Sequence, residues 1–142
     1  MKILLFVVAL ILPFSALADR DYENGSYWTV QSVDTKPGKF DAYVSDLNQY
    51  WRKSMDEMVK EGKILSYQIF SNVLPRDGEP DLWLLLQWKN GAEMLDTSDE
   101  YWDAQTKKLF GSIDQGTQAT VERGDLRTIM SNVLMREVSF KK

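Results

Sequence analysis

The sequence predicts an α+β fold in which helices cover one face of a four-stranded antiparallel sheet. Stretches with the two-residue period of strands and the 3.6-residue period of helices follow one another as strand, helix, strand, strand, helix, strand. The two central strands are joined by a short turn, which makes them an antiparallel hairpin. With 142 residues, the chain has the length of one domain.

The first strand is predicted over Tyr27–Lys36, where Trp28, Val30 and Val33 stand among threonine and glutamine residues. The dipeptide Pro37-Gly38 ends this strand. Proline also fits the first turn of the helix that follows, because its missing N–H would have no partner there.

The first helix is predicted from apolar residues spaced by three and four, which form one broad stripe. Gly62 stands at the expected end of this helix. We interpret the stripe as the face that packs on the sheet, with a ligand-binding face as the alternative. Its members are Phe40, Tyr43, Val44, Leu47, Tyr50, Trp51, Met55, Met58 and Val59.

The next two strands are predicted at 64–74 and 81–89, on either side of a turn rich in proline. The second of them has apolar residues on both faces: Leu82, Leu84, Leu86 and Trp88 on one, Trp83 and Leu85 on the other. Both faces are therefore expected to be buried. Because the helices cover only one face of the sheet, we expect a second copy of the chain to cover the other, in a two-fold homodimer.

The second helix is predicted from about Ala92 to Phe110. It has a break at 96–100, where acidic and hydroxyl residues can begin a new helix. The stretch 111–127 is polar, contains glycine and shows little periodicity, so a long loop or a short irregular helix is expected there. The last strand is predicted over Thr128–Phe140.

The N-terminus has the pattern of a secretory signal peptide. A lysine and an apolar run from Ile3 to Leu12 precede the small-residue stretch 15–18. The apolar run is too short to span a bilayer, so we expect cleavage after about Ala18 and no stable membrane anchor thereafter. The predicted division is a signal peptide at 1–18, a polar lead at 19–26 and a single domain at 27–142, which is periplasmic or secreted.

The composition excludes several kinds of site. The chain contains no cysteine and no histidine, which rules out disulfides, Cys–His and Ser–His–Asp nucleophile systems and histidine-based metal sites. The formal net charge of −4 argues against nucleic acid as a partner. No phosphate-binding glycine motif occurs. We therefore expect no metal and no other cofactor.

Several short features together carry a family resemblance. They are Lys36-Pro37-Gly38-Lys39-Phe40 at the start of the first helix, Gly62 at its end, the apolar strand 82–88 and the pair Tyr101-Trp102. With the element order of the ferredoxin-like fold, the chain resembles, over about residues 27–140, the dimeric α+β barrel superfamily, which includes antibiotic-biosynthesis-type monooxygenases and NIPSNAP-like domains. The resemblance implies a homodimeric barrel. In the cofactor-independent oxygenases of this superfamily, Trp, Tyr, Asn and Arg side chains lie beside an aromatic substrate that itself activates oxygen.

Side chains of these types are candidates for contact with a ligand. They are Tyr67, Asn72, Trp83, Trp88, Arg123, Arg127 and Asn132. The first hypothesis is an exported homodimer that binds a small apolar or aromatic molecule between sheet and helices. The second is a cofactor-independent monooxygenase-like enzyme, and the third is a protein-interaction module without catalysis. The sequence leaves all three open.

Overall fold

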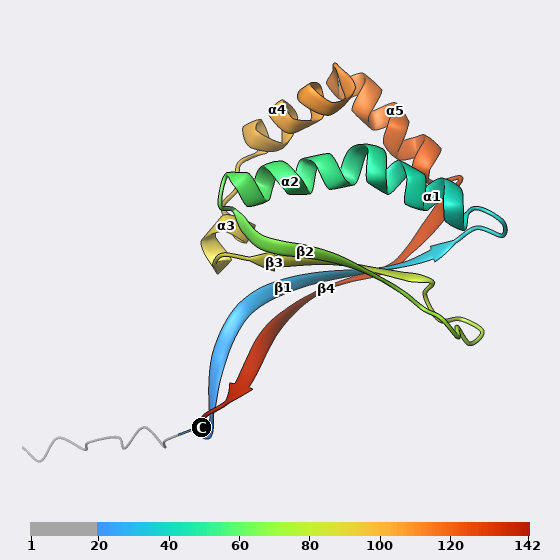
Figure 1. Ribbon diagram of the computed structural model, residues 1–142. Coiled ribbons are helices and arrows are strands. Elements are labelled where there is room, and N and C mark those ends of the chain that lie inside the picture. The colour runs from blue at the N-terminus through green and yellow to red at the C-terminus, as the bar shows by residue number, and fades with distance from the viewer. Residues whose placement is uncertain (1–19) are drawn as a thin grey trace, which may run out of the picture.

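The computed structural model describes residues 20–142, and the predicted signal peptide at 1–18 lies outside them. Figure 1 shows the helices on one side of a single sheet. The strands are β1 (Tyr22–Thr35), β2 (Ile64–Ser71), β3 (Leu82–Trp88) and β4 (Arg127–Phe140). Their spatial order is β2-β3-β1-β4, and all neighbouring strands are antiparallel. The predicted α+β class and ferredoxin-like element order are confirmed.

The first helix runs without a break through three segments. These are α1 (Phe40–Asp46), a π-helical turn η1 (Leu47–Trp51) and α2 (Arg52–Lys60). The backbone keeps helical angles at both junctions. Gly62, with a φ of 72°, ends the helix as predicted, because glycine adopts this left-handed conformation without strain. Single π-helical turns inside helices are frequent at functional sites.

The second helical region contains α3 (Gly91–Leu95), α4 (Asp99–Phe110) and α5 (Ile113–Arg123). The predicted break before α4 is confirmed, and the Ser98 side chain caps the new helix by accepting a hydrogen bond from the backbone N–H of Tyr101. The expectation of a loop or irregular helix at 111–127 is wrong. Most of this stretch is the regular helix α5, which begins at a cap made by Ser112.

Gly116 explains why the composition of α5 was misleading. A Cβ atom at this position would lie 2.3 Å from Cγ2 of Thr106 and 3.4 Å from Cδ2 of Phe110. The glycine therefore lets α5 approach α4 closely instead of ending a helix. In Figure 1 the two helices meet at a wide angle and lie over the first helix.

Strand β1 begins at Tyr22, so residues 22–26 of the segment interpreted as a polar lead belong to the sheet. They pair with the end of β4, where Tyr22 lies opposite Phe140. Figure 1 shows this pair of strands extending beyond β2 and β3 as a ribbon that bends away from the helices. Hydrogen bonding to β4 makes these residues a strand, although they lack an alternating apolar pattern.

The hydrophobic core lies between the sheet and the first helix. It consists of two neighbouring clusters, and each combines residues of the helix with residues of the strands. The first contains Val33, Tyr43, Leu47, Leu82 and Leu84. The second contains Met55, Met58, Ile64 and Trp88. The helical stripe is therefore largely a packing face.

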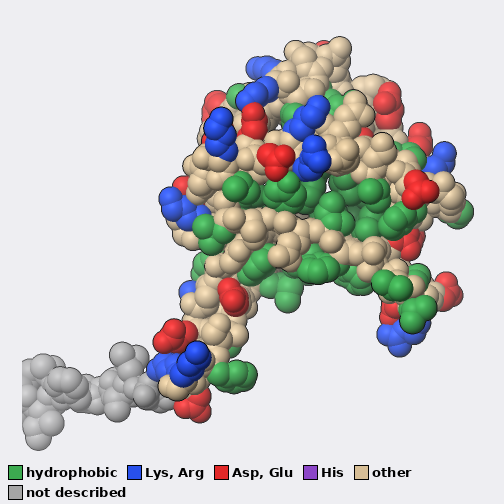
Figure 2. Space-filling view, in the orientation of Figure 1, with side chains coloured by type: hydrophobic (Ala, Val, Ile, Leu, Met, Phe, Trp, Pro, Cys, Tyr) green, Lys and Arg blue, Asp and Glu red, His purple; other side chains and the backbone are tan. Residues whose placement is uncertain are grey.

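None of the helices within residues 20–142 covers the opposite face of the sheet. On β3, Trp83 and Leu85 lie on this face, since Leu84 between them is buried on the helix side. The register places Val30 beside both Leu85 and Val133. Figure 2 shows hydrophobic side chains gathered beneath the sheet. We call this surface the open face; it comprises Trp28, Val30, Phe70, Trp83, Leu85, Val133 and Met135.

Candidate functional site

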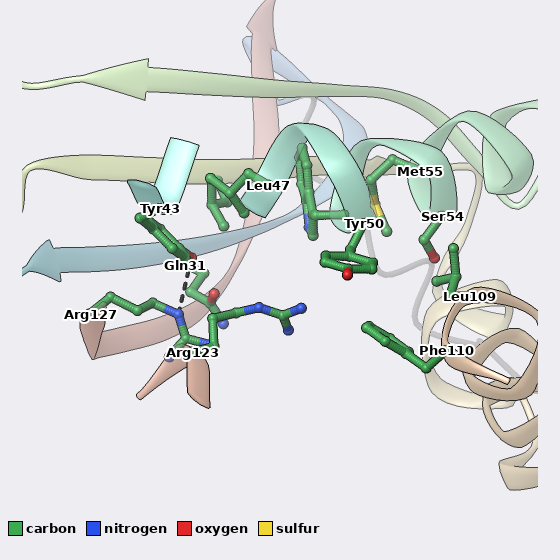
Figure 3. Close-up of a pocket in the computed structure, with 12 residues that line it drawn as sticks. Gln31, Tyr43, Leu47, Tyr50, Ser54, Met55, Leu109, Phe110, Arg123 and Arg127 are labelled. Atoms are coloured by element: carbon green, nitrogen blue, oxygen red, sulfur yellow. Dashed lines mark hydrogen bonds between the residues drawn. The ribbon is translucent and has the colours of Figure 1, made fainter. Parts of the chain in front are cut away.

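A cavity of about 290 Å³ lies between the sheet and the helices, and we call it the central cavity. Strands β1, β3 and β4 contribute to its floor, while all helices except α3 contribute to its walls. Figure 3 shows its side chains converging from these elements. They are Gln31, Tyr43, Leu47, Tyr50, Trp51, Ser54, Met55, Leu84, Leu109, Phe110, Arg123 and Arg127.

Aromatic rings form one wall of the central cavity. Tyr50 from η1 and Phe110 from the end of α4 stack with ring centroids 4.8 Å apart and an angle of 25° between their planes. Trp51, the next residue of η1, also lines the cavity and meets Tyr67 edge-to-face at 5.2 Å. Stacked and edge-to-face pairs of this kind are favourable beyond the area they bury. The wall is thus rigid and apolar.

Two guanidinium groups form the polar side of the cavity. Arg123, the last residue of α5, donates from Nε to Oδ2 of Asp46 at 2.6 Å, and both side chains are largely buried. Its Cζ lies 6.0 Å from the ring centroids of both Tyr50 and Phe110, within the range of a cation–π contact. One cation therefore touches the aromatic wall and is neutralised by an acid.

The second guanidinium belongs to Arg127, the first residue of β4. It pairs with Thr35 of β1, two residues from the buried Val33, so its side chain lies on the helix side of the sheet. Nε of Arg127 donates a hydrogen bond of 3.1 Å to the phenol oxygen of Tyr43, drawn as a dashed line in Figure 3. The guanidinium also lies 5.5 Å from the Tyr43 ring.

Tyr43 is buried almost completely, with an exposed fraction of 1%. Burial raises the pKa of its phenol, while the nearby charge of Arg127 acts in the opposite direction. The raised pKa means that the phenol keeps its proton at neutral pH. Tyr43 can therefore accept a hydrogen bond from Arg127 and donate one to a bound molecule.

A smaller pocket of about 230 Å³ adjoins the central cavity and shares Gln31, Trp51 and Leu84 with it. Trp88 and Asn132, two of the predicted contact residues, line this pocket. Nε1 of Trp88 donates to Oγ1 of Thr29 at 3.1 Å, so the indole N–H is already satisfied. This pocket extends the space along the sheet.

The structure divides the predicted contact residues into two groups. Four of them, Arg123, Arg127, Trp88 and Asn132, line the central cavity or the pocket beside it. The other three do not. Tyr67 lines an outer groove beside the first helix and donates to Asp56 at 2.5 Å, which raises its pKa. Asn72 bonds to Glu79 and Pro80 within the hairpin loop, and Trp83 lies on the open face.

Sequence reasoning missed the aromatic wall of the cavity. The sequence favours a packing stripe for Tyr43, Tyr50 and Trp51, with a ligand-binding face as the alternative, and it places Phe110 at the end of another helix. Three consecutive stripe positions at 47, 50 and 51 mark the side of the helix that lines the cavity, but their spacing is that of any buried helix. Whether a residue of this helix lines the cavity or packs in the core depends on where α4 and α5 lie. Local periodicity does not carry that information.

No group of three or more acidic, histidine or cysteine side chains able to hold a metal occurs within residues 20–142. In the same part of the chain, no helix is both long and apolar enough to cross a membrane. Neither finding separates the three functional hypotheses.

Comparison with known proteins adds to the description of the fold. No family model and no curated protein matches the chain. Among solved structures, HapK from Hahella chejuensis is 5% identical with a TM-score of 0.50, covering 78% of this chain and 91% of that chain. This likeness shows a shared fold. With the strand order, it confirms the predicted ferredoxin-like fold.

Two further structures are similar at lower scores. A dimeric ferredoxin-like protein from an uncultured marine organism is 8% identical, with a TM-score of 0.49, and the match covers 84% of this chain and 91% of that chain. A proposed antibiotic biosynthesis monooxygenase from Chloroflexus aurantiacus is 14% identical, with a TM-score of 0.44 and coverages of 83% and 98%. At these identities the activity has to be argued from this chain's own residues.

Proposed function

We propose that this domain binds a small aromatic or apolar molecule in the central cavity. The observation that carries the proposal is the stacked pair Tyr50 and Phe110 on the wall of a preformed cavity that also holds polar side chains. Ligand sites are typically apolar hollows with a few convergent polar groups. The central cavity has this composition.

The size of the cavity sets the size of the ligand. An apolar cavity of about 150 Å³ holds one benzene molecule. A cavity of about 290 Å³ therefore suits a molecule of about two fused rings. The adjoining pocket beside Trp88 and Asn132 offers room for a substituent.

The binding proposal is tested with 2-naphthylmethanol, a neutral two-ring probe. Isothermal titration calorimetry on the purified protein should show saturable binding with one site per chain. In the variant Ser54→Phe a ring replaces a small side chain of the cavity wall, so binding should be lost. Ser139→Phe, on the exposed end of β4, makes the same exchange far from the cavity and should leave binding unchanged.

A ligand carried through purification is the second readout. Native mass spectrometry of the freshly purified protein should reveal an aromatic molecule, and that molecule should be absent from Ser54→Phe. Saturable binding that survives Ser54→Phe, or no binding by either the naphthyl alcohol or its carboxylate analogue, would contradict the proposal.

We also propose that the domain acts as a homodimer joined through the open face. The face exposes Phe70, Val133 and Met135, each to 45% or more, in a row of apolar residues that single folded chains normally cover. A second copy offers a surface of the same shape and chemistry, as a two-fold interface requires. The central cavity lies on the helix side of the sheet, so this interface leaves it free.

Export is the third part of the proposal. The segment 1–18 has a lysine, an apolar run and a small-residue end, which together direct secretion and cleavage. Mass spectrometry of protein recovered from the periplasmic fraction of a bacterial host should give a chain that begins at Asp19. Full-length protein that stays in the cytoplasmic fraction would contradict export and would leave the binding proposal standing.

A further inference from the structure

We propose that the ligand of the central cavity is an aromatic acid, and that Arg127 binds its carboxylate or an equivalent oxyanion. This inference rests on the proposed function, because it assigns a chemical class to the molecule bound at that site. It goes further by requiring a negative charge on the molecule. The argument comes from the charges, the hydrogen bonds and the position of the aromatic wall.

The charges of the cavity do not balance. Among the residues that the structure describes, two guanidinium groups line it and no carboxylate does. Asp46, just outside the lining, forms an ion pair with Arg123. None of the ion pairs among residues 20–142 includes Arg127. The cavity therefore carries one positive charge in excess, and a partly buried cation is stabilised by an anionic partner.

The hydrogen bonds at Arg127 leave room for that partner. Its Nε is engaged by Tyr43, which holds the guanidinium plane in place. The edge formed by the two Nη groups is the one that binds a carboxylate end-on with two parallel bonds. The Tyr43 phenol lies on the Nε side of the guanidinium and leaves the Nη edge open. An oxyanion at that edge meets the two Nη donors of a guanidinium that Tyr43 holds in place.

The aromatic wall belongs to the same cavity as these donors. Arg123 joins the two regions, because its guanidinium lies 6.0 Å from the ring centroids of Tyr50 and Phe110. A ligand with a ring system at one end and an acid at the other fits this polarity. A neutral hydrocarbon would leave Arg127 without a counter-charge, and a small inorganic anion would leave the aromatic wall uncovered.

The overall charge of the protein makes the test selective. The formal net charge is −4, so long-range electrostatics disfavour the binding of an anion. A preference for an anionic probe must therefore come from a local positive site. The probes are 2-naphthoate and 2-naphthylmethanol, which have the same ring system and differ in charge.

Calorimetric titrations at pH 7.4 and low salt should give about tenfold or tighter binding of 2-naphthoate than of 2-naphthylmethanol, as expected for a charge-assisted bidentate contact. In Arg127→Met the ratio between the affinities for 2-naphthoate and 2-naphthylmethanol should fall to about one. Arg76→Met is the matched control, because it removes the same charge from the exposed hairpin loop and should keep the preference.

Three outcomes decide between the claims. Equal binding of the two probes by the unaltered protein overturns the anion proposal and leaves the proposed function standing. Absence of binding by both probes overturns the proposed function itself. If Arg127→Met does not fold, two other measurements test the role of Arg127. They are the preference for naphthoate in Arg127→Lys and the salt dependence of naphthoate binding by the unaltered protein. A preference that neither added salt nor the lysine variant weakens would contradict a role for Arg127.

Discussion

At the scale of single residues, tyrosines connect the helices to their surroundings through their hydroxyl groups. Tyr43 accepts from Arg127 within the cavity, while Tyr101 of α4 donates to Oε2 of Glu61 at 2.7 Å. The pKa of the Tyr101 phenol is raised. Burial is the largest cause, and the hydrogen bond to Glu61 raises it further. Both phenols therefore keep their protons to a higher pH in the folded protein than in the unfolded chain.

The first prediction concerns stability at alkaline pH. The pKa of Tyr101 is higher in the folded state than its ordinary value of 10.0. The contribution of this residue to the free energy of unfolding is therefore complete below pH 10.0 and is lost as the pH rises above that value. Urea unfolding should therefore show a free energy of unfolding that falls above about pH 10. Tyr101→Phe should show a shallower fall, because it removes one of the groups that titrate.

Tyr43 and Tyr67 have pKa values raised in the same direction, so Tyr101→Phe should lessen the alkaline loss without abolishing it. Below pH 10 the variant should be less stable by about 1 kcal/mol, the typical net value of one hydrogen bond. Parallel stability curves for the variant and the unaltered protein would contradict the assignment.

At the scale of elements, the cavity exists because the α4–α5 pair is held beside the first helix. Arg123 is paired with Asp46, and Lys108 is paired with Glu57. The close approach of α5 to α4 depends on Gly116. Since Phe110 lies next to that glycine and also stacks on Tyr50, the packing of the helix pair and the shape of the aromatic wall are linked.

The second prediction follows from this link. In Gly116→Ala the new methyl group would lie 2.3 Å from Thr106 Cγ2 and 3.4 Å from Phe110 Cδ2, so the side chains between the two helices must shift. We expect a loss of about 1–3 kcal/mol in the free energy of unfolding, as for other overpacked contacts. Binding of 2-naphthylmethanol should weaken as well, because Phe110 shifts. Urea unfolding and calorimetry measure the two effects.

Gly91→Ala is the control for this substitution. A Cβ at Gly91 would lie 3.7 Å from the nearest ring atom of Tyr27, an ordinary contact distance. It should change neither stability nor binding appreciably. Equal behaviour of the two alanine variants would show that close packing of α4 and α5 does not shape the cavity.

At the scale of the whole molecule, the two faces of the sheet have different roles. The helix face holds the core and the central cavity, whereas the open face presents aromatic and aliphatic side chains without cover in the single chain. The ribbon formed by the ends of β1 and β4 bends toward the open side in Figure 1. We expect a second copy to occupy this side.

The third prediction tests the homodimer. Light scattering coupled to size-exclusion chromatography should give twice the mass of the single chain at micromolar concentration. Val133→Glu should give a monomer, because a two-fold interface through the open face would bury two carboxylates without partners. Val121→Glu, on the exposed side of α5, should remain dimeric. A monomeric unaltered protein would remove the homodimer from the proposed function.

The order and class of the elements were predictable because helices and strands leave local periodic traces. The apolar spacing from Phe40 to Val59 identifies a helix, and the apolar strand around Leu84 identifies a buried part of the sheet. Together they predict that this helix packs on this sheet. The early start of β1 and the helical character of α5 were not predictable in this way. The first depends on pairing with β4, and the second on a glycine that serves packing.

Composition and periodicity suffice to predict the fold class and to exclude histidine and cysteine chemistry. The family resemblance adds Arg123 and Arg127 as candidates, and both line the central cavity. Which aromatic rings line the cavity and which fill the core depends on tertiary packing. Tyr50 and Phe110 are far apart along the chain, and their stacking depends on how α4 and α5 lie over the first helix. Periodicity shows which side of a helix or strand is apolar. It does not show which other element packs against that side, because this depends on the packing of the whole fold.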